Sequence, residues 1–281
     1  MNNSFAEHDL EIVIATMNQK RLDFLIPMFP FSHFSDFSIL VINQTQENKI
    51  LASDYPSVRV INSFEKGLSR SRNSGIQSAI GKIILIADDD VVFIENFQKI
   101  IIKAYNENQN ATVICFQTIT QKGDSYSNYL KKKKKLNNRK IRKVLSIEVT
   151  GKVEDLRKNN CFFNEFFGLG STFQDSETFF FLRSIRYKRL KVLFQPSVIV
   201  KHESFSSSDD ACSDRVIYAR MAGFYKTYGI VAYLLLLKYM FFLTRKYNLS
   251  VFEIKRKFGV GLSGIYDYKL ILNKKLDSRY E

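Results

Sequence analysis

The segment ILIADDDVVF, residues 84–93, decides the fold, because an apolar run ends there on three adjacent carboxylates, Asp88, Asp89 and Asp90. The run is continuously apolar from 83 to 87, which is typical of a central strand covered on both faces. Three neighbouring acids repel one another and are costly to bury without partners. We therefore expect these carboxylates at the end of a strand, where a ligand binds.

The surrounding sequence predicts a sheet flanked by helices. Further strands are expected at 11–16, 37–43, 58–63 and 111–119, and helical apolar spacing covers 68–80 and 96–108. Strands that alternate with helices favour a doubly wound parallel sheet. Such sheets bind ligands at the carboxyl ends of their strands, so the acids are expected in a ligand crevice rather than in the core.

Composition narrows the class of protein and the kind of partner. The chain has 281 residues, of which 45% are hydrophobic, and a formal net charge of +14. That charge suits nucleic acid, an anionic membrane face or negatively charged small molecules. Three widely spaced cysteines without a CxxC pair argue against a zinc site or a disulfide framework and favour a reducing, cytoplasmic compartment.

The acidic cluster has the chemistry of a divalent-metal site. Asp88 and Asp90 are one residue apart, and Mg²⁺ or Mn²⁺ binds one or two carboxylates together with water and phosphate oxygens. Upstream, Arg70, Arg72 and Asn73 lie near the start of the helix expected at 68–80, which suits phosphate binding. The alternatives are an acidic turn before the next helix and a capped, solvated helix start.

These motifs carry a resemblance to a known family. The SRN of 71–73, the segment GKIILIADDD and the later FFGLGSTFQDSETFFFLRSIRYKRLKVLFQPSVIVKHE resemble, in order and spacing, the family 2 glycosyltransferases of the GT-A fold over residues 9–205. The resemblance implies an α/β fold, namely the Rossmann-like GT-A nucleotide-diphospho-sugar transferase fold with a mainly parallel central sheet. Within that family, the sequence also resembles bacterial enzymes that build capsular or other surface polysaccharides.

The resemblance also implies a domain organisation. A catalytic domain at 1–205 contains a nucleotide-sugar-binding half at about 9–120 and an acceptor-side half at about 121–205. The latter includes a basic loop at 131–143. Beyond the resemblance, the sequence from about 211 to 258 reads as helices, so a C-terminal helical region is expected at 206–281.

The resemblance assigns roles to individual residues. Thr16 and Asn18 are expected to contact the base or ribose, and Asn43 stands where the family usually has an Asp that holds the base. The nucleotide-sugar-binding set implied by the motifs is Thr16, Asn18, Asn43, Arg72, Asn73, Asp88 and Asp89. The implied metal ligands are Asp90, Asp88 and His202. His202 could instead be an exposed residue at a strand end.

The catalytic base is expected near residue 178. An inverting transfer needs a carboxylate that takes the proton of the acceptor hydroxyl. The family's Gly-Glu-Asp motif falls on 176–178, where Thr178 replaces the usual Asp, so Glu177 or Asp175 is the expected base. Both acids could instead cap the following helix. Gly168 and Gly170 are expected to bring the backbone close to the acceptor sugar, or to form a simple turn.

One basic segment and one apolar segment are candidates for contact with a membrane. The loop at 131–143 contains nine Lys or Arg and is either a solvated, mobile loop or a contact for phosphates or an anionic surface. The apolar segment 228–243 is too short to span a bilayer. It is expected to be a helix packed on the catalytic domain or an interfacial helix.

The leading hypothesis is an inverting, metal-dependent glycosyltransferase with Mn²⁺ or Mg²⁺ as cofactor. Its partners would be a nucleotide-diphosphate sugar, with a UDP-sugar favoured, a glycan or lipid-linked acceptor and the inner face of the plasma membrane. A nucleotidyltransferase is the second enzyme hypothesis, although IATMNQKR lacks the glycines of its usual loop. A basic nucleic-acid-binding protein is the third, but no nucleic-acid module is found and no nucleic-acid partner is expected.

Overall fold

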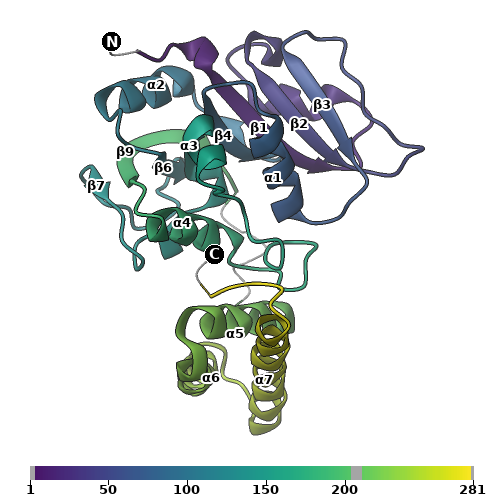
Figure 1. The fold of residues 1–281 in the computed structure, drawn as a ribbon, viewed down its shortest axis with the longest axis vertical. Coiled ribbons are helices and arrows are strands. Elements are labelled where there is room, and N and C mark those ends of the chain that lie inside the picture. The colour runs from purple at the N-terminus through teal and green to yellow at the C-terminus, as the bar shows by residue number, and fades with distance from the viewer. Residues whose placement is uncertain (1–3, 204–210, 280–281) are drawn as a thin grey trace. The chain divides into compact units, whose positions relative to one another are not determined.

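The computed structural model describes residues 4–203 and 211–279. The chain divides into two compact units, each described here by itself (Figure 1). The first unit comprises Met1–Phe163 and Phe181–Ser204, and the second comprises Asn164–Phe180 and Phe205–Glu281.

A mixed but mostly parallel sheet forms the first unit. Its strands are β1 (Leu10–Met17), β2 (Ile39–Gln44), β3 (Val58–Ser63), β4 (Ile83–Asp88), β5 (Val92–Phe93), β6 (Val113–Ile119), β7 (Lys134–Lys135), β8 (Val149–Lys152) and β9 (Val192–Lys201). Their order is β3-β2-β1-β4-β8-β6-β9-β5, and β7 pairs separately with β9. The strands β3, β2, β1 and β4 are mutually parallel, as are β6 and β9. The expectation of a mainly parallel sheet is confirmed.

The central strands form because they are buried on both faces, as the apolar run before the acids predicts. β2 is buried along its whole length, and β1 and β4 are buried except at their last residues, Met17 and Asp88. α1 (Leu68–Ser78) packs on β1 and β2, and α2 (Phe97–Glu107) packs on β9 (Figure 1). Gly75 permits the close approach of α1, because a Cβ atom there would overlap the Val13 side chain.

The strands β5, β7 and β8 were not expected from the sequence. β8 is antiparallel to both of its neighbours, β4 and β6. Its sequence, VTGK, is short and contains a glycine, so it lacks the apolar pattern of a central strand. Tertiary contacts hold it instead: Thr150 Oγ1 donates to the carbonyl of Ile114 at 2.8 Å and lies 3.0 Å from Tyr105 Oη. α3 (Val153–Lys158) follows immediately.

The basic segment at 131–143 is attached to the sheet. β7 pairs with β9 through Lys134 and Phe194, and Leu136 and Ile141 are buried anchors. The Arg186 guanidinium donates to the carbonyl of Leu136 and to the side chain of Asn138. The segment therefore follows a defined path, and its lysines extend from an anchored backbone.

Helices form most of the second unit. α5 (Asp214–Tyr228), α6 (Ala232–Tyr247) and α7 (Val251–Asn273) pack around a common core, whose buried residues include Met221, Leu236 and Ile265 (Figure 1). α4 (Glu177–Tyr187) begins in this unit and belongs to the first unit from Phe181 onward. Gly264 lets α7 lie against the backbone of α5, because a Cβ atom there would overlap the carbonyl of Tyr218.

The stretch Asp214–Tyr247 is long and apolar enough to cross a membrane by length and composition, and 28% of its most apolar window is buried. Gly229, with φ of 58°, ends α5 and separates it from α6. The 16 residues of α6 span roughly 24 Å, which is less than the roughly 30 Å thickness of a bilayer core. The break therefore favours two separate helices over one continuous span.

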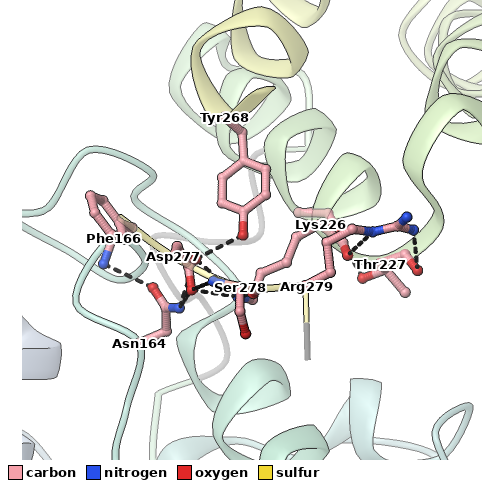
Figure 2. A network of polar contacts seen from close by, with 9 residues as sticks. Asn164, Phe166, Lys226, Thr227, Tyr268, Asp277, Ser278 and Arg279 are labelled. Atoms are coloured by element: carbon pink, nitrogen blue, oxygen red, sulfur yellow. Dashed lines mark hydrogen bonds and ion pairs between the residues drawn. The ribbon is translucent and has the colours of Figure 1, made fainter. Parts of the chain in front are cut away.

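A buried polar network ties the C-terminal tail to this unit (Figure 2). The Asp277 carboxylate accepts hydrogen bonds from Lys226 Nζ and Asn164 Nδ2 at 2.9 Å and from Tyr268 Oη at 2.7 Å. Lys226 is fully buried, and its ammonium group lies over the Tyr268 ring. One carboxylate thus joins α5, α7 and the start of the 164–180 segment.

Candidate active site

Several of the residues expected from the sequence meet at one edge of the parallel sheet. Because β1, β2 and β4 run in the same direction, their carboxyl ends share that edge. Thr16 is in register with Asn43, and Ala15 is in register with Asp88. Asp88, the first of the three acids, therefore lies at the same edge as the polar carboxyl ends of β1 and β2. Ligands bind at this edge in this type of sheet.

Asp88 is held by a buried arginine. Arg72 Nη2 donates to Asp88 Oδ1 at 2.8 Å and to Ser146 Oγ at 2.9 Å, and its guanidinium lies 5.5 Å from the centre of the Phe163 ring. Only 1% of the Arg72 side chain is exposed. This arginine is therefore not part of a solvated helix start, and it supplies fixed positive charge at the first acid of the cluster.

Asp89 turns to the end of β1. Its Oδ2 accepts hydrogen bonds from Thr16 Oγ1 and, at 3.3 Å, from Gln19 Nε2. These neutral donors stabilise the carboxylate without cancelling its charge.

Asp90 meets His202 because of a strand pairing. β5 follows the acids and pairs with the end of β9, with Val92 opposite Lys201, which brings Asp90 beside the residue that follows β9. Asp90 Oδ1 lies 3.4 Å from His202 Nε2. The Asp90 carboxylate raises the pKa of His202, and the hydrogen bond to His202 in turn lowers the pKa of Asp90.

The orientation of His202 suits a metal ligand. Its Nδ1 lies 2.9 Å from the carbonyl oxygen of Glu203, which places a proton on Nδ1. Nε2 faces Asp90, where it donates when protonated and offers its lone pair to a cation only after losing that proton. The Tyr126 ring lies against the imidazole, with the ring centres 6.0 Å apart. Two ligands of one ion at about 2.1 Å lie roughly 3 Å apart when at right angles, which is close to the observed separation. This pair therefore fits a divalent cation that completes its shell with phosphate oxygens and water.

The three adjacent acids thus have three different partners, namely Arg72, the Thr16–Gln19 pair and His202. Their separate orientations reduce the repulsion that the sequence alone implies. Within residues 4–203 and 211–279, no group of three or more His, Cys, Asp or Glu side chains is arranged to hold a metal ion. A metal here would depend on ligands from the substrate.

The asparagines expected in the site take different positions. Asn43 is fully buried and exchanges two hydrogen bonds of 3.1 Å with the backbone of Gln19, so it shapes the turn after β1. Asn18 is exposed in that turn, with φ of 56°. Asn73 exchanges two hydrogen bonds with the backbone of Phe163, at 2.9 and 2.7 Å. Asn43 and Asn73 therefore hold backbone segments around the acids.

The expected base candidates belong to the second unit. Asp175 Oδ2 accepts a hydrogen bond from Arg220 Nε at 2.9 Å, and Arg220 also donates to Tyr239 Oη at 3.1 Å. Ser176 has φ of 69°, a conformation that is uncommon outside glycine and that reorients the chain between Asp175 and Glu177. Glu177 begins α4, and its carboxylate accepts from Thr178 Oγ1 at 3.3 Å.

Gly168 and Gly170 form the turn that precedes these acids. Both have positive φ, 106° and 77°, which a residue with a side chain rarely adopts. The turn is closed by a hydrogen bond of 2.8 Å from Gly168 N to the carbonyl of Phe173. The glycines are thus required by the backbone geometry itself.

Four residues that contact the expected site residues were not found from the sequence: Gln19, Tyr126 and Ser146 in the first unit and Arg220 in the second. Each contacts a residue at least 45 positions away along the chain, for example Arg220 with Asp175 and Ser146 with Arg72. Their residue types are common at surfaces and helix starts, so sequence spacing carried no signal for them.

Comparison with known proteins identifies the family. The model of glycosyl transferase family 2 matches residues 12–157, more than half of the chain, and the chain therefore belongs to this family. The matched region contains the triplet of acids, Arg72 and Asn43. A comparison with curated proteins gave no match.

Solved structures share the fold. A fragment of S. aureus TarS matches with a TM-score of 0.52 and 13% identity, over 92% of this chain and 72% of that chain. The same fragment in complex with UDP matches with a TM-score of 0.52 and 14% identity, over 86% and 72%. Its complex with UDP-GlcNAc matches with a TM-score of 0.52 and 11% identity, over 91% and 81%.

The family and the fold together define a glycosyltransferase with the GT-A fold and a nucleotide-sugar donor. The resemblance inferred from the sequence is confirmed. The nucleotidyltransferase and nucleic-acid-binding hypotheses are replaced by this assignment.

Proposed function

We propose that this chain is an inverting, metal-dependent glycosyltransferase that uses a UDP-sugar as donor. The observation that carries the proposal is the separation of the three acids at the sheet edge, each with its own partner. Arg72 and the acids Asp88 and Asp89 would bind the nucleotide, together with the polar ends of β1 and β2. The UDP complexes of TarS, a protein with the same fold, support the choice of uridine.

The cofactor in this proposal is Mn²⁺ or Mg²⁺. Asp90 and His202 would hold the ion, with Asp88 as the third ligand implied by the motif, although Arg72 already matches the charge of Asp88. When bound, the ion neutralises negative charge on the departing diphosphate. Arg72 would also stabilise the negative charge of the departing diphosphate, because its own positive charge is fixed in the donor site.

Asp175 is the proposed base. The acceptor hydroxyl oxygen forms a bond to the anomeric carbon while the bond to the diphosphate oxygen breaks, and the hydroxyl proton passes to the carboxylate. The hydrogen bond from Arg220 Nε fixes the orientation of the Asp175 carboxylate, and the positive φ of Ser176 sets the backbone beside it. Glu177 is the second candidate, because it lies two residues further on at the start of α4.

Calorimetric titration tests the donor site. UDP and GDP are titrated into wild type and Asp90→Asn, in Mn²⁺ and in EDTA. The proposal expects UDP to bind in Mn²⁺ and binding to weaken by at least about tenfold in EDTA or in the variant. UDP affinity that is the same in Mn²⁺ and EDTA would refute metal-dependent donor binding.

A pair of matched substitutions tests the base. Asp175→Asn and Glu177→Gln each remove one charge while preserving shape. The base variant should lose turnover by about 10²–10⁴-fold with donor binding unchanged, and the other variant should retain most activity. Unchanged turnover in both variants would show that the base lies elsewhere.

The acceptor in this proposal is a glycan or lipid-linked saccharide used in surface polysaccharide synthesis at the inner face of the plasma membrane. The outward face of α6 supports this location. Leu234, Leu237 and Phe241 are more than half exposed, while Leu236 and Met240 pack inward. Lys238, Arg245 and Lys246 extend from α6, whose sequence contains no acidic residue. An apolar face with basic residues suits an anionic lipid surface.

Vesicle sedimentation tests this location. Wild type should sediment with phosphatidylglycerol vesicles at low salt, and the double variant Leu237→Glu with Phe241→Glu should not. Ile26→Glu with Ile80→Glu is the control, because both residues are exposed in the first unit and the change in charge is the same. Equal loss in both double variants would indicate net charge alone, and would refute a role for α6.

A further inference from the structure

A cavity lies in the first unit, within the 127–148 region. Its volume is about 350 Å³, within the range of small-molecule sites. It is enclosed by residues 127–130, by parts of 136–144, by Glu148 and by Phe194 of β9. The proposed donor site does not use any of these residues, so the cavity needs its own explanation.

Much of the surface that lines this cavity is apolar. Leu136 and Phe194 are almost completely buried, and the Tyr129 ring lies nearly parallel to that of Phe194, with the centres 6.0 Å apart. Leu130 and Val144 complete the apolar lining. Tyr129 Oη is occupied by the Glu148 carboxylate, which also accepts from Leu145 N at 3.0 Å. This apolar surface suits a hydrocarbon chain, while Ser127, Asn128 and Asn137 contribute polar groups to the rest of the lining.

Three positively charged residues also line the cavity. Arg139, Lys140 and Lys143 line it, and these three form no ion pair with any acid in the described part of the chain. Lys134 lies so close to Lys140 that partial burial and this second ammonium group lower the pKa of Lys140. Cations held near one another without counter-charges favour a bound anion.

We propose that this cavity binds an amphipathic phosphate, that is, a phosphate group that carries an aliphatic chain. The chain lies against Leu136, Val144 and Phe194, and the phosphate is bound by Arg139, Lys140 and Lys143. Such a ligand could be a single dissolved molecule or a lipid that remains in a bilayer. The inference does not depend on the proposed reaction, since binding here requires neither donor nor metal.

Two wall segments also reach the donor site. Ser146, between Val144 and Glu148 in the chain, accepts the hydrogen bond from Arg72, and Tyr126, next to Ser127, contacts His202. The cavity therefore adjoins the donor site through the same backbone segments.

Calorimetry with dodecyl phosphate below its micelle concentration tests the proposal, on the full chain without nucleotide. Wild type should bind dodecyl phosphate. Inorganic phosphate, which lacks the aliphatic chain, and dodecyl maltoside, which lacks the phosphate, should each bind at least about tenfold more weakly. Lys140→Gln with Lys143→Gln should weaken binding by about tenfold. Val144→Trp should remove it by filling the cavity.

Lys131→Gln with Lys132→Gln is the matched control, because it removes the same charge from exposed positions that do not line the cavity. Equal weakening by both lysine pairs, unchanged binding in Val144→Trp or absence of binding in wild type would each overturn the proposal. Phosphatidylglycerol vesicles identify the source: if Val144→Trp also abolishes sedimentation, the ligand is a bilayer lipid. If sedimentation persists while dodecyl phosphate binding is lost, the ligand is a single dissolved molecule.

Discussion

Replacing Asp277 by asparagine should destabilise the second unit strongly, because it leaves a buried lysine without its counter-charge. Lys226 is fully buried and Asp277 is 5% exposed, and the carboxylate accepts from Lys226, Asn164 and Tyr268 together (Figure 2). Asparagine preserves the shape of the side chain but removes the charge and one acceptor oxygen. The ammonium group of Lys226 would then be buried without the negative charge of Asp277.

The expected cost follows from the burial of both partners. Breaking a buried ion pair from one side costs about 3–5 kcal/mol, since the remaining charge keeps its desolvation penalty. With a urea m-value of about 2 kcal/mol/M, the unfolding midpoint should fall by about 2 M. Removing the charge of the lysine as well, in Lys226→Met with Asp277→Asn, should restore most of the loss, because no buried charge remains.

Urea unfolding followed by far-UV circular dichroism measures this effect on the full chain. Asp23→Ala is the control, because it breaks an exposed ion pair with Arg21 and should change stability by less than about 0.5 kcal/mol. The reasoning is refuted if Asp277→Asn costs no more than Asp23→Ala. It is also refuted if the double variant is no more stable than Asp277→Asn alone.

Three further predictions concern packing, pH and the donor site. Gly264→Ala should destabilise by about 1–3 kcal/mol in urea unfolding, whereas Gly259→Ala, in the same helix with open space around it, should stabilise by about 0.5–1 kcal/mol; equal effects would contradict the packing of α7. Burial raises the pKa of Glu148 to about 7, so the folded state holds its proton more tightly than the unfolded state, and stability should fall by about 2–3 kcal/mol between pH 4.5 and 7. In urea unfolding, Glu148→Gln should not show this loss of stability between pH 4.5 and 7. A pH dependence equal to that of wild type would show that Glu148 is not its cause. Arg72→Lys should weaken UDP binding by about tenfold in calorimetry, because lysine cannot contact Asp88 and Ser146 with the same planar group; wild-type affinity would remove Arg72 from the donor site.

Much of the parallel sheet could be predicted from the sequence. The apolar run before Asp88 is long enough to require burial on both faces, and the alternation of strands with helices then requires parallel pairing. β3 was placed correctly and β1, β2, β4 and β6 to within one or two residues at each end. The helical spacing at 68–80 and 96–108 identified α1 and α2 for the same reason, because burial of one face imposes a period on local sequence.

The segment 121–160 could not be predicted in this way. β8 is a four-residue strand whose burial comes from β4 and β6, more than 30 residues away, rather than from its own composition. The basic segment reads as solvated because its lysines are exposed, yet Leu136 and Ile141 anchor it. Two apolar residues among nine cations are too weak a local pattern to reveal an anchor that depends on β9.

The sequence by itself determined that three acids end a buried strand and that a ligand edge must lie there, because charge cannot remain in an apolar sheet interior. Only the tertiary structure decided which partner each acid has. The β5–β9 pairing brings Asp90 to His202, and the burial of Arg72 aims it at Asp88. Those contacts join residues 16 to 112 positions apart, and side-chain direction across such separations is set by packing, which local sequence does not encode.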